Sequence, residues 1–301
     1  MTLLPLLKPR YWLLWAGIAI LWCLTHLPHH WQLAIGRQFG RLTYRLAPRR
    51  RNIADTNLKL CFPELNETQR HQLLHKHFES LGMGLFEMLN AWWLPDETLK
   101  PLGQIQGMEH LDAALKRGKG VILLGAHLTP VEIGVRFLTM HIALHAIYRP
   151  HGNPLMEYFM KKNRECHAEK AITRDAVRDM LRSLKQNKPL WLATDQNFGH
   201  KHSVFVDFFG IKAATNTIIS RLVQVSGATV VPFFTQRLEH HQGYKVILQA
   251  ALEQFPSGDN VQDALQINQL IEAQIRKAPE QYLWVHRRFK DRPQGEASFY
   301  Q

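Results

Sequence analysis

The chain has 301 residues, with 37 Lys or Arg against 25 Asp or Glu, so its formal net charge is +12. Hydrophobic residues make up 46% of it, which excludes the disordered and fibrous classes of protein. Three cysteines (Cys23, Cys61 and Cys166) without CxxC spacing argue against a disulfide framework and a thiolate zinc site, and indicate a reducing compartment. The charge favours a polyanionic partner: nucleic acid, an anionic membrane surface or an acidic protein.

The first apolar segment predicts attachment to a membrane. No residue from Tyr11 to Leu27 carries a formal charge, and Trp12 to Leu24 contains only apolar residues and Gly. Its length is at the short end of the roughly 17–25 residues that span a bilayer, so the segment either spans or lies re-entrant. A signal peptide would need an Ala-x-Ala-like cleavage site, which is missing; a buried core helix is the other alternative. We therefore predict a single N-terminal anchor over residues 1–30.

Basic residues on both sides of this segment predict where the rest of the chain lies. Lys8 and Arg10 precede it, and a larger group of arginines follows, namely Arg37, Arg41, Arg45, Arg49, Arg50 and Arg51. Under the positive-inside rule, either topology leaves the bulk of the chain facing the cytoplasm. The stretch from Gln38 to Arg51 also has interleaved apolar residues, which favours an anionic membrane surface as partner; a solvated helix face is the alternative.

Two parts follow the anchor within one expected catalytic domain, residues 31–301. Residues 31–103 have a helical pattern, clearest from Glu67 to Trp93, and residues 104–301 alternate short apolar runs with amphipathic stretches. The expected strands are 120–126, 143–149, 189–195, 229–236 and 244–252, and the expected helices are 108–117, 130–140, 154–168, 174–187, 215–226 and 261–278. This alternation predicts an α/β fold with a mixed, largely parallel sheet flanked by helices. In that class, functional side chains gather at the carboxyl ends of strands.

His127 directly follows the first apolar run, and Glu132 lies five residues later, where the next helix is expected to begin. Across a strand–loop–helix turn the two side chains are able to converge. The carboxylate would then fix the tautomer of the imidazole, and the imidazole would remove a proton from a hydroxyl. The pair therefore predicts a His–carboxylate dyad.

The spacing alone is weak evidence, because about 1.4 such pairs are expected by chance in a chain with this many His and acidic residues. Three occur: His127–Glu132, His202–Asp207 and His286–Asp291. Only the first follows a buried-strand pattern, so position favours it. Two alternatives remain open: Glu132 as part of a Thr129–Glu132 capping box, and His127 as an ordinary loop histidine.

The other strand ends add polar residues to this pair. Arg149 ends the second apolar run, Arg164 lies in the helix that follows, and Asp195 and Gln196 end the run that begins at Pro189. Taken singly, Arg149 and Arg164 have surface ion pairs as the alternative, and Asp195 has a helix or turn cap. Together with His127, they predict a site at three successive strand ends.

The chain resembles the lipid A biosynthesis secondary acyltransferases, the lauroyl/myristoyl acyltransferase family, and looks closest to the lauroyl-transferring branch. The resemblance spans nearly the whole chain, from the N-terminal apolar segment through the Arg50–Pro63 stretch. It continues in HLTPVEIG, YRPHGNPL, TDQNFG, SVFVDFFG and the C-terminal APEQYLWVHRRFKDRPQG. It implies a glycerolipid-acyltransferase-like fold. It also implies a place at the bacterial inner membrane, with the active site facing the cytoplasm.

The resemblance also implies transfer of a fatty acyl chain from acyl-acyl carrier protein to a 3-hydroxyacyl hydroxyl of a Kdo-bearing lipid A precursor. His127 would be the general base and Glu132 its orienting partner. Arg149 and Arg164 would line the site and bind phosphate or stabilise charge, with Asp195 and Gln196 supporting them. No metal or cofactor is expected, and the partners would be the carrier protein, the lipid precursor and the membrane, not nucleic acid.

The chemistry is consistent with this reading. A hydroxyl needs a poised base to attack a thioester, and the tetrahedral oxyanion needs donors, which an arginine or the backbone N–H groups after Thr129 would supply. No GxSxG elbow occurs, so we expect direct transfer without an acyl-enzyme. Apolar residues at 204, 206, 208, 209 and 211 are candidates for an acyl channel, with an ordinary core strand as the alternative. The rival functions are a lysophospholipid or glycerol-phosphate-type acyltransferase and a non-enzymatic binder of anionic ligands at a membrane.

Overall fold

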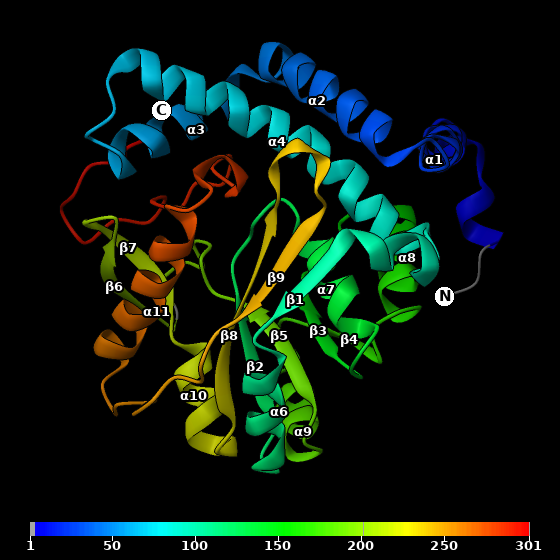
Figure 1. Cartoon of the computed structure of the whole chain (residues 1–301). Coiled ribbons are helices and arrows are strands. Elements are labelled where there is room, and N and C mark those ends of the chain that lie inside the picture. Colours follow the sequence, from blue (N-terminus) through cyan, green and yellow to red (C-terminus); the bar gives the residue numbers. More distant parts are fainter. Residues whose placement is uncertain (1–3, 201, 301) are drawn as a thin grey trace.

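The structure is a computed structural model that describes residues 4–200 and 202–300. In this part of the chain, a seven-stranded sheet has the order β1-β9-β8-β2-β5-β3-β4 (Figure 1). The strands are β1 (Gly103–Gln106), β2 (Val121–Gly125), β3 (His145–Tyr148), β4 (Lys170–Thr173), β5 (Pro189–Ala193), β8 (Thr229–Arg237) and β9 (Tyr244–Leu248). All neighbouring strands are parallel except β8 and β9, so the predicted mixed, largely parallel sheet is confirmed.

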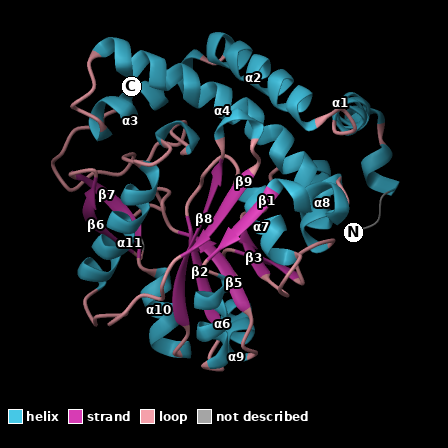
Figure 2. Ribbon diagram, in the orientation of Figure 1, coloured by secondary structure: helices cyan, strands magenta, loops and turns pink. Residues whose placement is uncertain are grey.

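Helices pack on both faces of this sheet (Figure 2). They are α6 (Met108–Lys116), α7 (Val131–Thr139), α8 (Pro154–Glu165), α9 (Val177–Lys185), α10 (Ile218–Ser226) and α11 (Asn260–Ile275). Side chains of the central strand β2 alternate between two hydrophobic cores, with Ile122 and Leu124 in one and Val121 and Leu123 in the other. All four are fully buried, as expected for a parallel strand that is covered on both faces.

Before the sheet, the chain forms a layer of helices: α1 (Trp12–Leu24), α2 (His29–Leu46), α3 (Pro48–Cys61), α4 (Glu67–Trp93) and the short α5 (Asp96–Leu99). The bounds of α4 match the predicted helix. Its first turn is fixed by a reciprocal capping box between Asn66 and Gln69.

Helices α2 and α4 pack backbone to backbone. A Cβ atom at Gly82 would lie 2.0 Å from the carbonyl oxygen of Gly36, and one at Gly40 would lie 2.1 Å from that of Phe78. Small residues are therefore needed on both helices at this crossing. Because α2 uses this glycine face to pack, its opposite face is exposed.

The predicted anchor segment forms α1, which has 13 residues. Within residues 4–200 and 202–300, no helix is long and apolar enough to cross a membrane. The spanning alternative for this segment is therefore unsupported. Part of α1 packs on the protein: Trp15 lies edge-to-face on Phe159 of α8, with ring centroids 5.2 Å apart.

Four strands are absent from the expected strands: β1, β4, β6 and β7. Strands β1 and β4 have only four residues each. Strands β6 (Ser203–Phe208) and β7 (Ile211–Asn216) form an antiparallel hairpin outside the large sheet, where β6 packs on α11. Four-residue strands are too short for an alternation of apolar and polar residues to distinguish them from loops.

Candidate active site

Four neighbouring strands place polar side chains in a row at their carboxyl ends. In β2 and β5 the last paired residues are Gly125 and Ala193, and His127 and Asp195 each lie two residues further along. In β3 and β4 the last paired residues are Tyr148 and Thr173, which Arg149 and Arg174 follow directly. Because parallel strands end at the same edge, the row His127, Asp195, Arg149, Arg174 follows from strand order and register.

Asp195 makes two hydrogen bonds with His127, one with the imidazole and one with the backbone. The Nδ1 atom of His127 lies 2.7 Å from one carboxylate oxygen, and the backbone N–H of His127 donates to the other at 3.0 Å. Asp195 is fully buried, whereas the side chain of His127 is 32% exposed. The Nε2 atom of His127 is thereby left as the ring nitrogen available to a ligand.

The two groups shift each other's pKa in opposite directions. Burial lowers the pKa of His127, but the charge of Asp195 and its hydrogen bond outweigh burial, so the pKa is raised above its ordinary value. Burial alone would raise the pKa of Asp195, but the interaction with His127 lowers it to about 2. This is the arrangement of a general base with an ionised orienting carboxylate.

The loop that carries His127 is fixed on several sides. The backbone N–H of Thr129 donates to the carbonyl of Gln281 at 2.7 Å, and the N–H of Leu283 donates to the carbonyl of His127 at 3.0 Å. The hydroxyl of Thr129 also lies 2.8 Å from that of Ser80 on α4 and accepts from the buried Arg237 at 3.2 Å. His127 is therefore held in a preset position by helix, sheet and C-terminal segment together.

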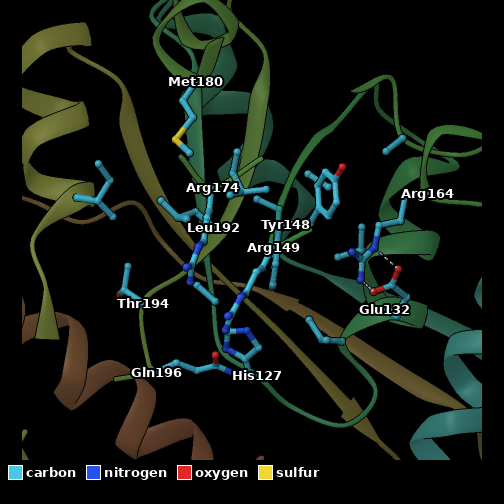
Figure 3. A pocket seen from close by; sticks show the side chains of 18 of the residues that line it. His127, Glu132, Tyr148, Arg149, Arg164, Arg174, Met180, Leu192, Thr194 and Gln196 are labelled. Atoms are coloured by element: carbon cyan, nitrogen blue, oxygen red, sulfur yellow. Dashed lines mark hydrogen bonds and ion pairs between the residues drawn. The ribbon is translucent and has the colours of Figure 1, made fainter. Parts of the chain in front are cut away.

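Glu132 lies in the same cavity but does not contact His127. Its carboxylate accepts two hydrogen bonds from Arg164 of α8, at 2.8 and 3.0 Å, and one from the indole N–H of Trp92 on α4, at 2.9 Å. Burial raises the pKa of Glu132, but the charge and hydrogen bonds of Arg164 outweigh it, so the pKa is lowered. Figure 3 shows Glu132 and Arg164 joined on one side of the cavity, with His127 on another.

The predicted pairing of His127 with Glu132 is thus wrong in this structure, and Asp195 has the orienting position. The physical reason is that Nδ1 of His127 faces the adjacent strand end, not the helix that follows it. The capping-box alternative for Glu132 is also wrong, because α7 has no side-chain cap and the Thr129 hydroxyl is bound by Ser80 and Arg237.

The remaining predicted residues line the site in different ways. Arg149 extends towards His127 in Figure 3, and Gln196 lines the same cavity. Arg164 is neutralised by Glu132, whereas no carboxylate pairs with Arg149 among the described residues. The expected oxyanion donors after Thr129 are partly occupied, since the N–H groups of Thr129 and Val131 donate to backbone carbonyls.

The cavity around these residues has a volume of about 710 Å³, within the range of small-molecule sites. One arm lies between α4, α7 and α8 and contains the Glu132–Arg164 pair. The other lies between β5, α9 and α10, and its lining is mainly apolar: Val177, Met180, Leu181, Leu192, Ile218, Leu222 and Val225. His127 lines the cavity as well, so an apolar chain in either arm is able to end at the imidazole.

The apolar residues predicted for an acyl channel lie elsewhere. None of the five lines the cavity, and Val206 and Phe208 are buried in the hairpin of β6 and β7. The core-strand alternative is therefore correct for Val206 and Phe208. Strand β6 contacts α11, and Phe208 belongs to the same hydrophobic core cluster as Ile267 and Ile271 of that helix.

Some cavity residues were missed in the sequence. Arg174 follows β4, the short strand that was not predicted, and its Nε atom is buried without a hydrogen-bond partner in the described structure. The buried atoms Nε1 of Trp191 and Oγ1 of Thr194 also lack such partners. Both residues line the cavity, although these two atoms are themselves buried within the protein.

In residues 4–200 and 202–300, no group of His, Cys, Asp and Glu side chains is arranged to hold a metal ion. The expectation of chemistry without metal or cofactor remains a prediction.

Comparison with known proteins gives consistent matches. Residues 3–291 match the family described as bacterial lipid A biosynthesis acyltransferase. The chain is 38% identical to the lipid A biosynthesis lauroyltransferase of Escherichia coli (strain K12), covering 100% of both chains. It is 36% identical to the palmitoleoyltransferase of that strain, covering 98% of this chain and 96% of the relative, and 28% identical to the myristoyltransferase, covering 97% and 91%.

A solved structure of a 1-acyl-sn-glycerophosphate acyltransferase from Thermotoga maritima also aligns, at 11% identity and a TM-score of 0.38, over 82% of this chain and 95% of that one. A TM-score this low does not establish a common fold, so the glycerolipid-acyltransferase-like description stays a prediction.

Proposed function

Because this chain belongs to the bacterial lipid A biosynthesis acyltransferase family and is an acyltransferase, we propose a specific reaction for it. The enzyme transfers a lauroyl or myristoyl chain from acyl-acyl carrier protein to a 3-hydroxyacyl hydroxyl of a Kdo-bearing lipid A precursor. The observation that carries the proposal is the His127–Asp195 pair, held at adjacent strand ends and opening into a cavity with an apolar arm.

His127 acts as the general base. With its Nδ1–H donated to Asp195, the Nε2 atom has a lone pair that accepts the proton of the acceptor hydroxyl as the oxygen attacks the thioester carbonyl. The tetrahedral intermediate then collapses, the C–S bond breaks, and the carrier thiolate takes the proton from the imidazolium. The ionised Asp195 stabilises that imidazolium while it exists.

Arg149 is the better candidate to stabilise the oxyanion. The charge of Arg164 is already compensated by Glu132, so its field at the reacting carbonyl is weak. Arg149 lies in the strand-end row with His127 and no carboxylate pairs with it in the described structure. An uncompensated guanidinium in a partly desolvated cavity is the stronger source of stabilisation.

The enzyme binds at a membrane surface through its N-terminal helices. Large apolar side chains of α1 and α2 are exposed: Trp12, Leu13, Ile20, Trp22, Trp31, Phe39, Leu42 and Leu46. Arg41 and Arg45 are exposed near them, and such a combination of apolar and basic side chains suits an anionic bilayer surface. Since α1 packs on α8, which carries Arg164, the lipid-facing side adjoins the cavity. We place this surface on the cytoplasmic face of the inner membrane.

The test is single-turnover transfer with detergent-solubilised enzyme, labelled lauroyl-carrier protein and the lipid precursor. We expect transfer by the wild type and a loss of about 10²-fold or more in His127→Ala. The circular dichroism and thermal melting of the variant should match the wild type. Transfer to a lysophospholipid but not to the lipid A precursor would instead favour the glycerolipid function, and full activity of the variant would remove His127 from the mechanism.

A further inference from the structure

A second cavity, of about 560 Å³, adjoins the catalytic one and has a strongly positive lining. Six cationic side chains contribute to it: Arg49, Arg50, Arg149, Arg174, Arg287 and Lys290. We call these six residues the basic cradle. The lining contains one carboxylate, Asp291, which is engaged by the side-chain amide of Asn197 at 2.7 Å. The cradle therefore has a large uncompensated charge.

The arginines at the start of α3 are placed where a helix disfavours them. Arg49 and Arg50 lie in its first turn, which has no acidic residue and no side-chain cap. Positive charge at a helix N-terminus is repelled by the helix dipole, and the two side chains also repel each other. Arg50 has one contact, with the carbonyl oxygen of Val285 at 3.2 Å. An anion in the cavity would relieve both repulsions.

A similar repulsion exists at the sheet edge. Arg149 and Arg174 directly follow a pair of residues in register on the adjacent strands β3 and β4. The two arginines therefore leave the backbone at neighbouring positions. The nearest carboxylate to Arg174, that of Asp175, is 3.8 Å away, beyond hydrogen-bond distance, and the Nε atom of Arg174 is buried without a hydrogen-bond partner in the described structure. The guanidinium of Arg174, whose side chain is 37% exposed, therefore lines the cavity without a hydrogen-bonded carboxylate among the described residues.

In the C-terminal segment, neighbouring cationic residues have different roles, since one is structural and two belong to the cradle. Arg288 is buried, and its guanidinium donates to Ala214 and Thr215 of β7. Arg287 instead contacts the ring of Tyr300 through its guanidinium, and Lys290 is exposed. His286 adds no charge, because its Nε2 accepts the backbone N–H of Asn197 at 3.0 Å.

We infer that the basic cradle binds the anionic headgroup of the lipid acceptor, through its phosphate or sugar-carboxylate oxyanions; this rests on the proposed function. Arg149 extends towards His127 and serves the reacting carbonyl, so the other five cationic side chains of the cradle hold the headgroup. Arg149, Arg174 and Phe198 line both cavities, so a ligand in the cradle continues towards His127. The cradle is concave, which suits a compact sugar phosphate, whereas a helix of a folded carrier protein needs a flatter surface. Leu46, at the end of α2, is 72% exposed and close in sequence to Arg49, so the cradle lies beside the membrane-facing helix.

The test compares the double variant Arg287→Gln/Lys290→Gln with a control that loses the same charge, Arg178→Gln/Lys185→Gln. The control residues are exposed on α9 and line neither cavity. Binding is measured calorimetrically, without turnover, using the bis-phosphorylated glucosamine disaccharide with its acyl chains removed, its phosphate-free form, and free Kdo. We expect one of the two anionic probes to bind the wild type and the control, and to bind the cradle variant about 30-fold more weakly, because two charge-assisted contacts are lost.

Steady-state kinetics give the second readout. In the cradle variant, the KM for the lipid acceptor should rise by a similar factor, while the KM for the acyl-carrier-protein donor stays within about twofold. A rise in the donor KM instead would assign the surface to the carrier protein and overturn the inference. The inference would also be overturned if the cradle variant and the control variant bound each anionic probe with the same affinity. Phosphate-dependent binding by a wild type that transfers no acyl chain would support the cradle and refute the proposed reaction.

Discussion

Two carboxylates near the catalytic cavity, the fully buried Asp195 and the partly buried Glu132 that lines it, have different partners. Asp195 binds the ring and the backbone N–H of His127, and Glu132 binds the guanidinium of Arg164 and the indole of Trp92. Both carboxylates are held ionised by the group beside them, since the pKa of each is lowered. The essential difference is that an imidazole exchanges a proton near neutral pH, whereas a guanidinium does not.

Because of this difference, one pair is suited to catalysis and the other to a structural role. The Asp195–His127 pair is able to accept and return a proton, so it is suited to catalysis. The Glu132–Arg164 pair joins α7 to α8, with Trp92 of α4 as a third member, and it therefore fixes the wall of the cavity. The next experiments break one pair at a time.

The largest effect is expected for Asp195→Asn. Losing the carboxylate removes the group that raises the pKa of His127, so that pKa should fall. The plateau rate should drop by about 10³-fold, because the imidazolium loses its counter-charge and its fixed tautomer. The acid limb of kcat/KM against pH should also move to lower pH, since the base stays neutral further into acid. A profile unmoved from that of the wild type would contradict the assignment of Asp195.

Glu132→Gln should act mainly on stability. It leaves the guanidinium of Arg164 without a counter-charge, although both side chains are about four-fifths buried. We expect the free energy of unfolding in urea to fall by about 3 kcal/mol, the lower end for a broken buried pair. Arg164→Met should lower the free energy of unfolding much less when it is added to Glu132→Gln than when it is made in the wild type, because the pair is already broken. A shift of the acid limb in Glu132→Gln would show instead that Glu132 orients His127 during catalysis.

Trp92→Phe is a smaller disturbance of the same wall. It removes one hydrogen bond to Glu132 and leaves both bonds from Arg164. Unfolding free energy should fall by about 1–2 kcal/mol, and turnover should stay within about threefold of the wild type. A loss of activity as large as that of Asp195→Asn would place Trp92 in contact with the reacting groups.

The smallest effect concerns stability and pH. Because the pKa of His127 is raised on folding, the stability from its charged form is fully present below the unfolded pKa of about 6.5 and is lost as pH rises through the folded value. The stability difference between the wild type and His127→Gln should therefore be larger at pH 5.5 than at pH 8.5, by less than about 1 kcal/mol for a side chain that is one-third exposed. Equal differences at the two pH values would contradict the raised pKa.

The sequence placed most residues of the candidate site at strand ends, since His127, Arg149 and Asp195 each end or follow an apolar run that predicted a strand. Arg174 was missed because β4 is too short to give a pattern. The sequence also placed Arg164 and Glu132 on the correct helices but did not pair them. Side chains 32 residues apart meet because α7 and α8 both pack against α4.

The sequence by itself determined the elements: buried apolar runs for β2, β3 and β5, and the capped helix α4. Local propensity and periodicity are short-range properties, so the sequence of each segment determines them. Only the tertiary structure decided the partners. His127 pairs with Asp195, 68 residues away, because β5 lies next to β2 in the sheet. Strand order is set by packing and hydrogen bonding across the whole sheet, and no single segment contains that information.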